Sequence, residues 1–183
     1  MAEPVAGKRE VLCDEQALAK VIEGLADQLR ELIATAKDPA IVGIRTRGLT
    51  LAERLRDLLS KGRKTPLPLG ILDITLYRDD LSTLASQPLV GPTDLPFDVD
   101  GRTIILADDV VFTGRTVRAA LEALIAFGRP AAVRLAVLVD RGHREYPIQP
   151  DLVGMKIETT ENQIVKVHFA EIDGEDGIDL ITR

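Results

Sequence analysis

Residues 104–116 read Ile-Ile-Leu-Ala-Asp-Asp-Val-Val-Phe-Thr-Gly-Arg-Thr, and this stretch is the most informative part of the sequence. Its apolar start predicts a buried strand over residues 103–107. Two adjacent carboxylates, Asp108 and Asp109, follow that strand, and the Thr-Gly-Arg-Thr sequence then opens a helix predicted to run to residue 127. A buried strand, a polar loop and a helix in this order are typical of an α/β protein with a mainly parallel sheet.

The segments before this stretch repeat the alternation of helix and strand. Apolar residues spaced by three and four predict a helix over residues 14–36, with Asp14 as its cap. A strand over residues 40–44, a helix over residues 49–60 and a strand over residues 69–77 follow. The sequence therefore predicts a parallel sheet flanked by helices.

The segments after residues 104–116 add one more strand to the parallel sheet and then antiparallel strands. Residues 133–139 form another apolar run, which predicts a third buried strand of the sheet. Residues 164–169 alternate between apolar and polar side chains, and residues 178–181 form a last short strand, so we expect antiparallel C-terminal strands. Residues 1–10 carry no periodic pattern and are expected to form a loose N-terminal arm.

Composition limits the classes of protein. The 183 residues, 45% apolar and 28% charged, suit one domain over residues 1–183. The lone cysteine, Cys13, excludes a disulfide within the chain, and with only His143 and His168 beside it the common zinc frameworks are excluded. The sequence has no apolar run of membrane-spanning length and no signal peptide, so we expect a cytoplasmic protein. The net charge of -6 disfavours nucleic-acid binding by bulk electrostatics.

Residues 78–98 differ from the rest of the chain. They contain Pro88, Gly91-Pro92 and Pro96 without sustained periodicity. Long connections of this kind are often lids or binding loops, so we predict a flexible lid loop here. A β-hairpin and a disordered insert remain as alternatives.

Polar clusters follow three of the predicted strands. They are residues 45–48 (Arg-Thr-Arg-Gly), Asp108-Asp109, and residues 140–143 (Asp-Arg-Gly-His). Ligands of open parallel sheets bind beyond the carboxyl ends of the strands, so we expect the three clusters to line one crevice.

The middle cluster suggests the ligand. The start of the predicted helix offers free backbone N–H groups and the positive end of the helix dipole, and Gly114 lets an anion approach closely. Residues 113–116 are therefore a candidate phosphate cradle. Carboxylates accept hydrogen bonds from sugar hydroxyls, so Asp108 and Asp109 beside this cradle fit a ribose 5-phosphate. The alternative is a solvated Asp-Asp turn with a helix cap at Thr113 or Thr116. The P-loop and dinucleotide glycine motifs are absent.

Residues 104–116 resemble the PRPP-binding motif of type I phosphoribosyltransferases. Residues 43–48 (GIRTRG), 72–81 (LDITLYRDDL) and 137–145 (VLVDRGHRE) are similar to the PyrR family of pyrimidine operon regulators and uracil phosphoribosyltransferases. The resemblance implies a type I phosphoribosyltransferase-like fold and the conversion of uracil and PRPP to UMP and pyrophosphate, with Mg²⁺ bound through PRPP and no metal ligated by the protein alone.

The resemblance also implies roles for individual residues. Asp108, Asp109, Arg47 and Arg78 would be catalytic. The residues that would bind PRPP are Thr46, Arg47, Asp108, Asp109, Val110, Val111, Phe112, Thr113, Gly114, Arg115 and Thr116. Asp140, Arg141 and Gly142 would border the uracil pocket. Arg47 would face the departing pyrophosphate and Arg78 would clamp it. His143 is expected to orient neighbours or lie at the surface, and His168 to lie on the polar face of an exposed strand.

The family pattern fails in the segment where RNA-binding members carry more basic residues. Gln149 and Met155 stand where an Arg and a Lys are typical, and Glu158 adds a negative charge. Arg141, Arg144 and Lys156 remain as a candidate RNA-contacting patch. Two other functions stay open: a UMP-sensing, RNA-binding attenuator with little enzymatic role, and a phosphoribosyltransferase for another base such as a purine. We expect a homodimer or larger homo-oligomer, and no membrane partner.

Overall fold

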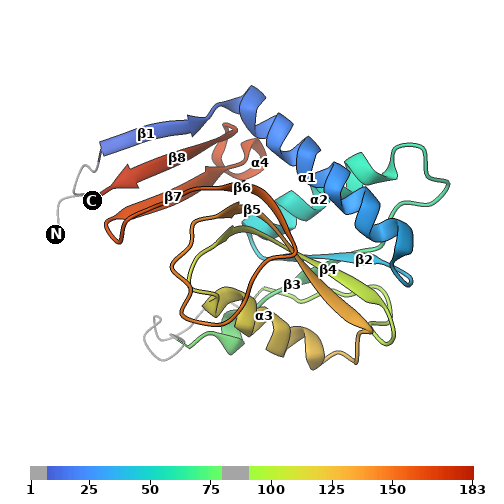
Figure 1. The fold of residues 1–183 in the computed structure, drawn as a ribbon. Coiled ribbons are helices and arrows are strands. Elements are labelled where there is room, and N and C mark those ends of the chain that lie inside the picture. The colour runs from blue at the N-terminus through green and yellow to red at the C-terminus, as the bar shows by residue number, and fades with distance from the viewer. Residues whose placement is uncertain (1–7, 80–90) are drawn as a thin grey trace.

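The computed structural model describes residues 8–79 and 91–183, and its centre is a parallel sheet of five strands (Figure 1). The strand order is β3-β2-β4-β5-β6, and all four pairings are parallel. The strands are β2 (Ala40–Ile44), β3 (Leu69–Leu72), β4 (Thr103–Val111), β5 (Ala132–Asp140) and β6 (Leu152–Lys156). The predicted mainly parallel sheet is confirmed.

Helices cover both faces of this sheet (Figure 1). α1 (Glu15–Thr35) and α2 (Arg47–Ser60) lie on one face, and α3 (Arg115–Ile125) lies on the other. Side chains of a strand point alternately to its two faces, so Ile105 of β4 packs in the core beneath α1 and α2, while Ile104 packs with α3. Asp14 caps α1 as predicted, since its carboxylate accepts the Ala17 N–H at 2.8 Å.

A separate antiparallel sheet lies beside the first and has the strand order β1-β8-β7. It consists of β1 (Lys8–Cys13), β7 (Gln163–His168) and β8 (Gly177–Thr182), with the short helix α4 (Ala170–Asp173) between β7 and β8. The antiparallel C-terminal strands are confirmed. The loose arm over residues 1–10 is wrong for residues 8–10, because these pair with β8; residues 1–7 lie outside the described part of the chain.

Two strand boundaries differ from the prediction, and one strand of the parallel sheet was missed. β4 continues through Asp108 and Asp109 to Val111, because it stays paired with β5 to that point. The strand predicted over residues 69–77 stops at Leu72 and gives way to a 3₁₀ turn, η1 (Thr75–Tyr77). β6 was not predicted.

His168 is buried rather than exposed. Its Nε2 lies 2.8 Å from Oδ2 of Asp179 on the neighbouring strand β8, and both side chains are buried. The carboxylate supplies the polar partner that a buried imidazole needs, which is why an apparently polar position tolerates burial.

The predicted lid over residues 78–98 is described at its two ends only, and residues 80–90 lie outside the described part. At the C-terminal end, Asp94 and Ile71 exchange two backbone hydrogen bonds of 2.7 and 2.9 Å, so this end is attached to β3. Among the helices that the structure describes, none is long and apolar enough to span a membrane.

Candidate functional site

A cavity of about 340 Å³ opens at the carboxyl ends of β2, β3 and β4, beside the start of α3. This is where a parallel sheet is expected to bind its ligand. The cavity brings together a large share of the predicted site residues: Thr46, Arg47, Arg78, Asp108, Asp109, Val110 and Thr116.

The two carboxylates at the end of β4 differ in exposure. The side chain of Asp108 is buried, with 5% of the residue exposed, and its Oδ1 accepts the Asp109 N–H at 3.0 Å. Burial and then the neighbouring charge of Asp109 raise the pKa of Asp108 well above its usual range. Burial also raises the pKa of Asp109, although the charge of Arg47 opposes this effect. The pair is therefore costly to keep ionised without a bound partner.

This raised pKa predicts a pH-dependent effect of Asp108→Asn on stability. Below the unfolded-state pKa of about 4, both states are protonated and the variant and parent should be equally stable. As pH rises from there through the raised folded-state pKa, the parent loses stability because its native state binds the proton more tightly. At pH 7.5 we expect Asp108→Asn to unfold about 3 °C or more above the parent.

Thermal unfolding from pH 4 to pH 8 measures this difference. Asp57→Asn, which removes the same charge from an exposed side chain, serves as the control and should show no such growth with pH. A constant offset for Asp108→Asn across the range would contradict the burial argument.

The predicted phosphate cradle lies at the start of α3. Gly114 has φ +93°, in the left-handed region that favours glycine, and immediately precedes the helix. A Cβ there would lie 3.2 Å from Cβ of Tyr146. The loop after β5 braces this turn, because the N–H groups of Glu145 and Tyr146 donate to the Thr113 carbonyl at 2.9 and 3.0 Å.

The turn after β2 is attached to the antiparallel sheet. The Arg45–Thr46 peptide bond is cis, and α2 begins at Arg47. Nε of Arg47 donates to the Val167 carbonyl at 2.9 Å, and its Nη2 pairs with Asp173 at 2.7 Å. The structure therefore holds the guanidinium of Arg47 against β7 and α4, while its charge still acts on Asp109.

Asp73 was missed by the sequence reasoning, and it lines the same cavity. Its carboxylate accepts the N–H of Thr75 at 2.8 Å and that of Gly91 at 2.7 Å. Burial would raise the pKa of Asp73, but these hydrogen bonds and the charge of Arg45 hold it below its usual value. No clear signal in the sequence pointed to it, because Asp73 lies inside the strand predicted over residues 69–77, whereas the structure ends that strand at Leu72.

A second cavity, of about 570 Å³, follows β5 and β6 and is lined by the predicted base-pocket residues Asp140, Arg141 and Gly142. It adjoins the end of β4, where Val111 lies opposite Asp140. His143 reaches across it, with Nε2 2.6 Å from the Thr159 carbonyl. Thr159 and its neighbours were missed because β6 itself was missed.

The three residues of the candidate RNA patch do not form an exposed basic surface. Arg141 is only 6% exposed; its Nη2 donates to the Gln163 carbonyl at 2.5 Å and its guanidinium lies 4.0 Å from the centre of the Phe112 ring. The side chain of Arg144 is 12% exposed and pairs with Asp140 at 2.7 Å. Lys156 alone of the three is exposed.

Comparison with known proteins places the chain in a family. Residues 9–172 match the family model described as phosphoribosyl transferase domain. The chain is similar to proteins named bifunctional protein PyrR: that of Deinococcus radiodurans is 49% identical over 175 residues, 96% of this chain and 95% of the relative. That of Roseiflexus sp. is 46% identical over 176 residues, 96% of each chain.

Solved structures agree on the fold. A hypoxanthine phosphoribosyltransferase from Staphylococcus aureus superimposes with a TM-score of 0.69 at 19% identity, covering 100% of this chain and 98% of that one. A hypoxanthine-guanine-xanthine phosphoribosyltransferase superimposes with a TM-score of 0.66 at 21% identity, covering 95% and 94%. The predicted type I fold is confirmed, and the chain belongs to the phosphoribosyl transferase family and, within it, to the proteins named bifunctional protein PyrR.

Proposed function

We propose that the protein transfers the phosphoribosyl group of PRPP to uracil, giving UMP and pyrophosphate. One observation carries the proposal: Asp108 and Asp109 at the end of β4 and Thr116 at the start of α3 line one cavity. A carboxylate pair beside a helix N-terminus suits a sugar that carries a phosphate. The membership of the PyrR proteins supports uracil as the base, whereas the purine enzymes resemble the chain in fold alone.

The chain's own residues bind the sugar and its 5-phosphate. The phosphate would lie on the loop of residues 113–116, where backbone N–H groups and the hydroxyls of Thr113 and Thr116 are donors. Asp108 and Asp109 would accept hydrogen bonds from the ribose hydroxyls. In their ionised form, Asp108 and Asp109 would stabilise the positive charge that develops on the ribose ring during displacement at C1.

The opposite wall of the cavity would hold the pyrophosphate. The turn of residues 45–47 and Arg78 line the same cavity as the carboxylates, and both segments would bring positive charge to a leaving group that gains negative charge. Holding the two ends of PRPP in place also orients C1 for attack by the base. The lid over residues 78–98, with residues 80–90 outside the described part, stays a prediction.

The carboxylates of the cavity also suit Mg²⁺, which prefers oxygen ligands. Within residues 8–79 and 91–183, no group of three or more acidic, histidine or cysteine side chains forms a metal site. We therefore expect the ion to take most of its ligands from PRPP, with Asp108 or Asp109 nearby. When bound, Mg²⁺ neutralises charge on the pyrophosphate.

The base would lie in the second cavity, bordered by Asp140, Arg141 and Gly142. Incubating the protein with PRPP, Mg²⁺ and either uracil or a purine, and following nucleotide formation, tests the proposal. We expect UMP from uracil and little nucleotide from hypoxanthine or guanine. Turnover of a purine in place of uracil would refute the assignment of the base.

The charge distribution predicts weak binding to a pyrimidine leader RNA. The net charge is -6, Arg141 is buried, and the Arg144 guanidinium pairs with Asp140. Gln149 and Met155 offer no charge for phosphate contacts, and the loss of two such contacts lowers affinity by about tenfold or more.

A titration of the protein against the leader RNA of its own operon, with UMP present and at moderate salt, measures this affinity. Gln149→Arg with Met155→Lys should tighten binding, which gives a positive control in the same protein. Nanomolar, sequence-specific binding by the parent would overturn this prediction and favour an RNA-binding regulator.

We also propose that the protein works in the cytoplasm as a homodimer or larger assembly. Light scattering coupled to gel filtration measures its mass in solution. A monomer at micromolar concentration would refute the oligomeric expectation.

A further inference from the structure

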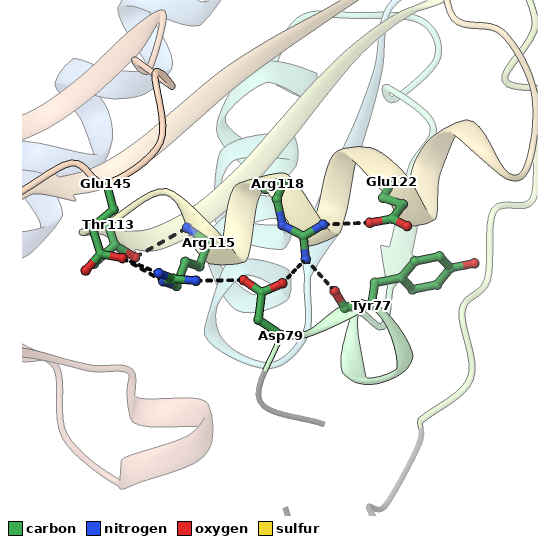
Figure 2. Close-up of polar contacts among 7 residues, drawn as sticks. All are labelled: Tyr77, Asp79, Thr113, Arg115, Arg118, Glu122 and Glu145. Carbon is green, nitrogen blue, oxygen red and sulfur yellow. Dashed lines mark hydrogen bonds and ion pairs between the residues drawn. The ribbon is translucent and has the colours of Figure 1, made fainter. Parts of the chain in front are cut away.

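Asp79 lies between two arginines of α3 (Figure 2). Its Oδ2 pairs with Nη1 of Arg115 at 2.9 Å, and its Oδ1 pairs with Nη2 of Arg118 at 2.6 Å. The same Nη2 of Arg118 donates to the Tyr77 carbonyl at 2.9 Å. Each carboxylate oxygen of Asp79 therefore pairs with a different guanidinium, and the backbone at Tyr77 is hydrogen-bonded to the same helix.

Arg115 extends this cluster to a third segment. It also pairs with Glu145, at 2.8 Å from Nε and 2.5 Å from Nη2 (Figure 2). Glu145 belongs to the loop whose backbone braces the Thr113 carbonyl. The guanidinium of Arg115 also lies 5.3 Å from the centre of the Tyr146 ring. Arg115 thus joins residue 79, the phosphate cradle and the loop after β5.

Asp79 is adjacent in the chain to a residue of the candidate site, so its ion pairs bear on the reaction. Asp79 directly follows Arg78, which lines the same cavity as Asp108 and Asp109. The 3₁₀ turn η1 before it is short, so the backbone at residue 78 depends on contacts beyond that turn for its position. The two ion pairs supply such contacts, from the helix that begins at the phosphate cradle.

We propose that Asp79 is a positioning residue: through Arg115 and Arg118 it holds the backbone of residue 78 at a fixed distance from the phosphate cradle, so that Arg78 meets the pyrophosphate end of PRPP. This inference rests on the proposed function for the identity of the ligand. Asp79 touches no substrate in this scheme. Asp79 restricts the movement of Arg78 before PRPP binds, so that less conformational entropy is lost when Arg78 meets its ligand.

The test compares Asp79→Asn with Glu122→Gln. Glu122 accepts from the other terminal nitrogen of Arg118, Nη1, at 2.8 Å, so its replacement removes one carboxylate from the same arginine without touching residue 79. Binding of PRPP with Mg²⁺ and binding of UMP are measured by calorimetry, without turnover. We expect Asp79→Asn to weaken PRPP binding by about tenfold and UMP binding by less than about twofold, because UMP has a 5-phosphate and no pyrophosphate. Glu122→Gln should change neither.

A double mutant shows whether Asp79 acts through Arg78. In an Arg78→Ala background, Asp79→Asn should cause no further loss of PRPP affinity, whereas two independent effects would add. Equal losses of PRPP and UMP affinity in Asp79→Asn would overturn the proposal, because they would show that the ion pairs of Asp79 stabilise only the phosphate cradle. Unchanged PRPP affinity would overturn it too. Binding of PRPP by a parent that does not turn over uracil would count against the proposed base and leave this test intact.

Discussion

Asp108→Asn and Asp109→Asn should each lower the turnover of uracil with PRPP by a factor of about 100 or more. Both carboxylates lie at the end of β4, in the cavity that the cradle of α3 completes. An asparagine keeps the shape of the side chain but removes the charge that stabilises the ribose ring as the bond to pyrophosphate breaks. The loss should therefore appear mainly in kcat, with a smaller change in KM.

Folding must be checked in the same variants, because a loss of structure would also lower turnover. Neither substitution changes side-chain volume, and for Asp108→Asn we expect higher stability at neutral pH because the pKa of the parental carboxyl is raised. Asp57→Asn serves as the exposed control and should keep parental turnover. Near-normal turnover in both active-site variants would show that the reaction takes place elsewhere.

Gly48→Ala should lower the free energy of unfolding by about 2–3 kcal/mol and turnover with it. A Cβ at Gly48 would lie 2.5 Å from the Ala107 carbonyl oxygen and 3.3 Å from Oδ1 of Asp108. The neighbour at 2.5 Å is the backbone of β4, which has a paired strand on each side and cannot shift easily. The start of α2 would have to move away from β4, and the turn after β2 moves with it.

Urea unfolding and a turnover assay measure the two effects. Gly24→Ala gives the matched control, because a Cβ there meets no atom within 4 Å and Gly24 lies inside α1. That change should stabilise the protein by about 0.5–1 kcal/mol through helix propensity. If Gly48→Ala were as stable as the parent, the close approach of α2 to the site would have no structural importance.

The parallel core could be predicted because its strands carry continuous apolar runs. β2, β4 and β5 are largely buried on both faces, so each can be predicted as a strand from its own apolar sequence. The carboxylates of the site followed from the same logic, since two charged residues at the end of a buried run add nothing to the core and so point to a ligand. The length of β4 was wrong, because pairing with β5, and not polarity, decides where that strand ends.

The elements that sequence reasoning missed depend on distant partners. β1 reads Lys-Arg-Glu-Val-Leu-Cys and is largely exposed, so only its pairing with β8 makes it a strand. β6 is half-buried and follows a proline-containing loop. His168 appeared to be a solvent-facing residue because Asp179 lies on another strand. Asp73 was hidden inside a run that resembled one continuous strand.

The pairing of β1 with β8 also affects the order in which the molecule can form. Residues 8–13 are synthesised long before residues 177–182, the strand with which they pair. The parallel sheet can assemble during synthesis, since its five strands are all complete before β7 and β8 are made. The antiparallel sheet must wait, and with it the contacts of Arg47 to Val167 and Asp173. A nascent chain can therefore have Asp108, Asp109 and the start of α3 in place before Arg47 is held by β7 and α4, and the candidate site is completed only as these two elements fold.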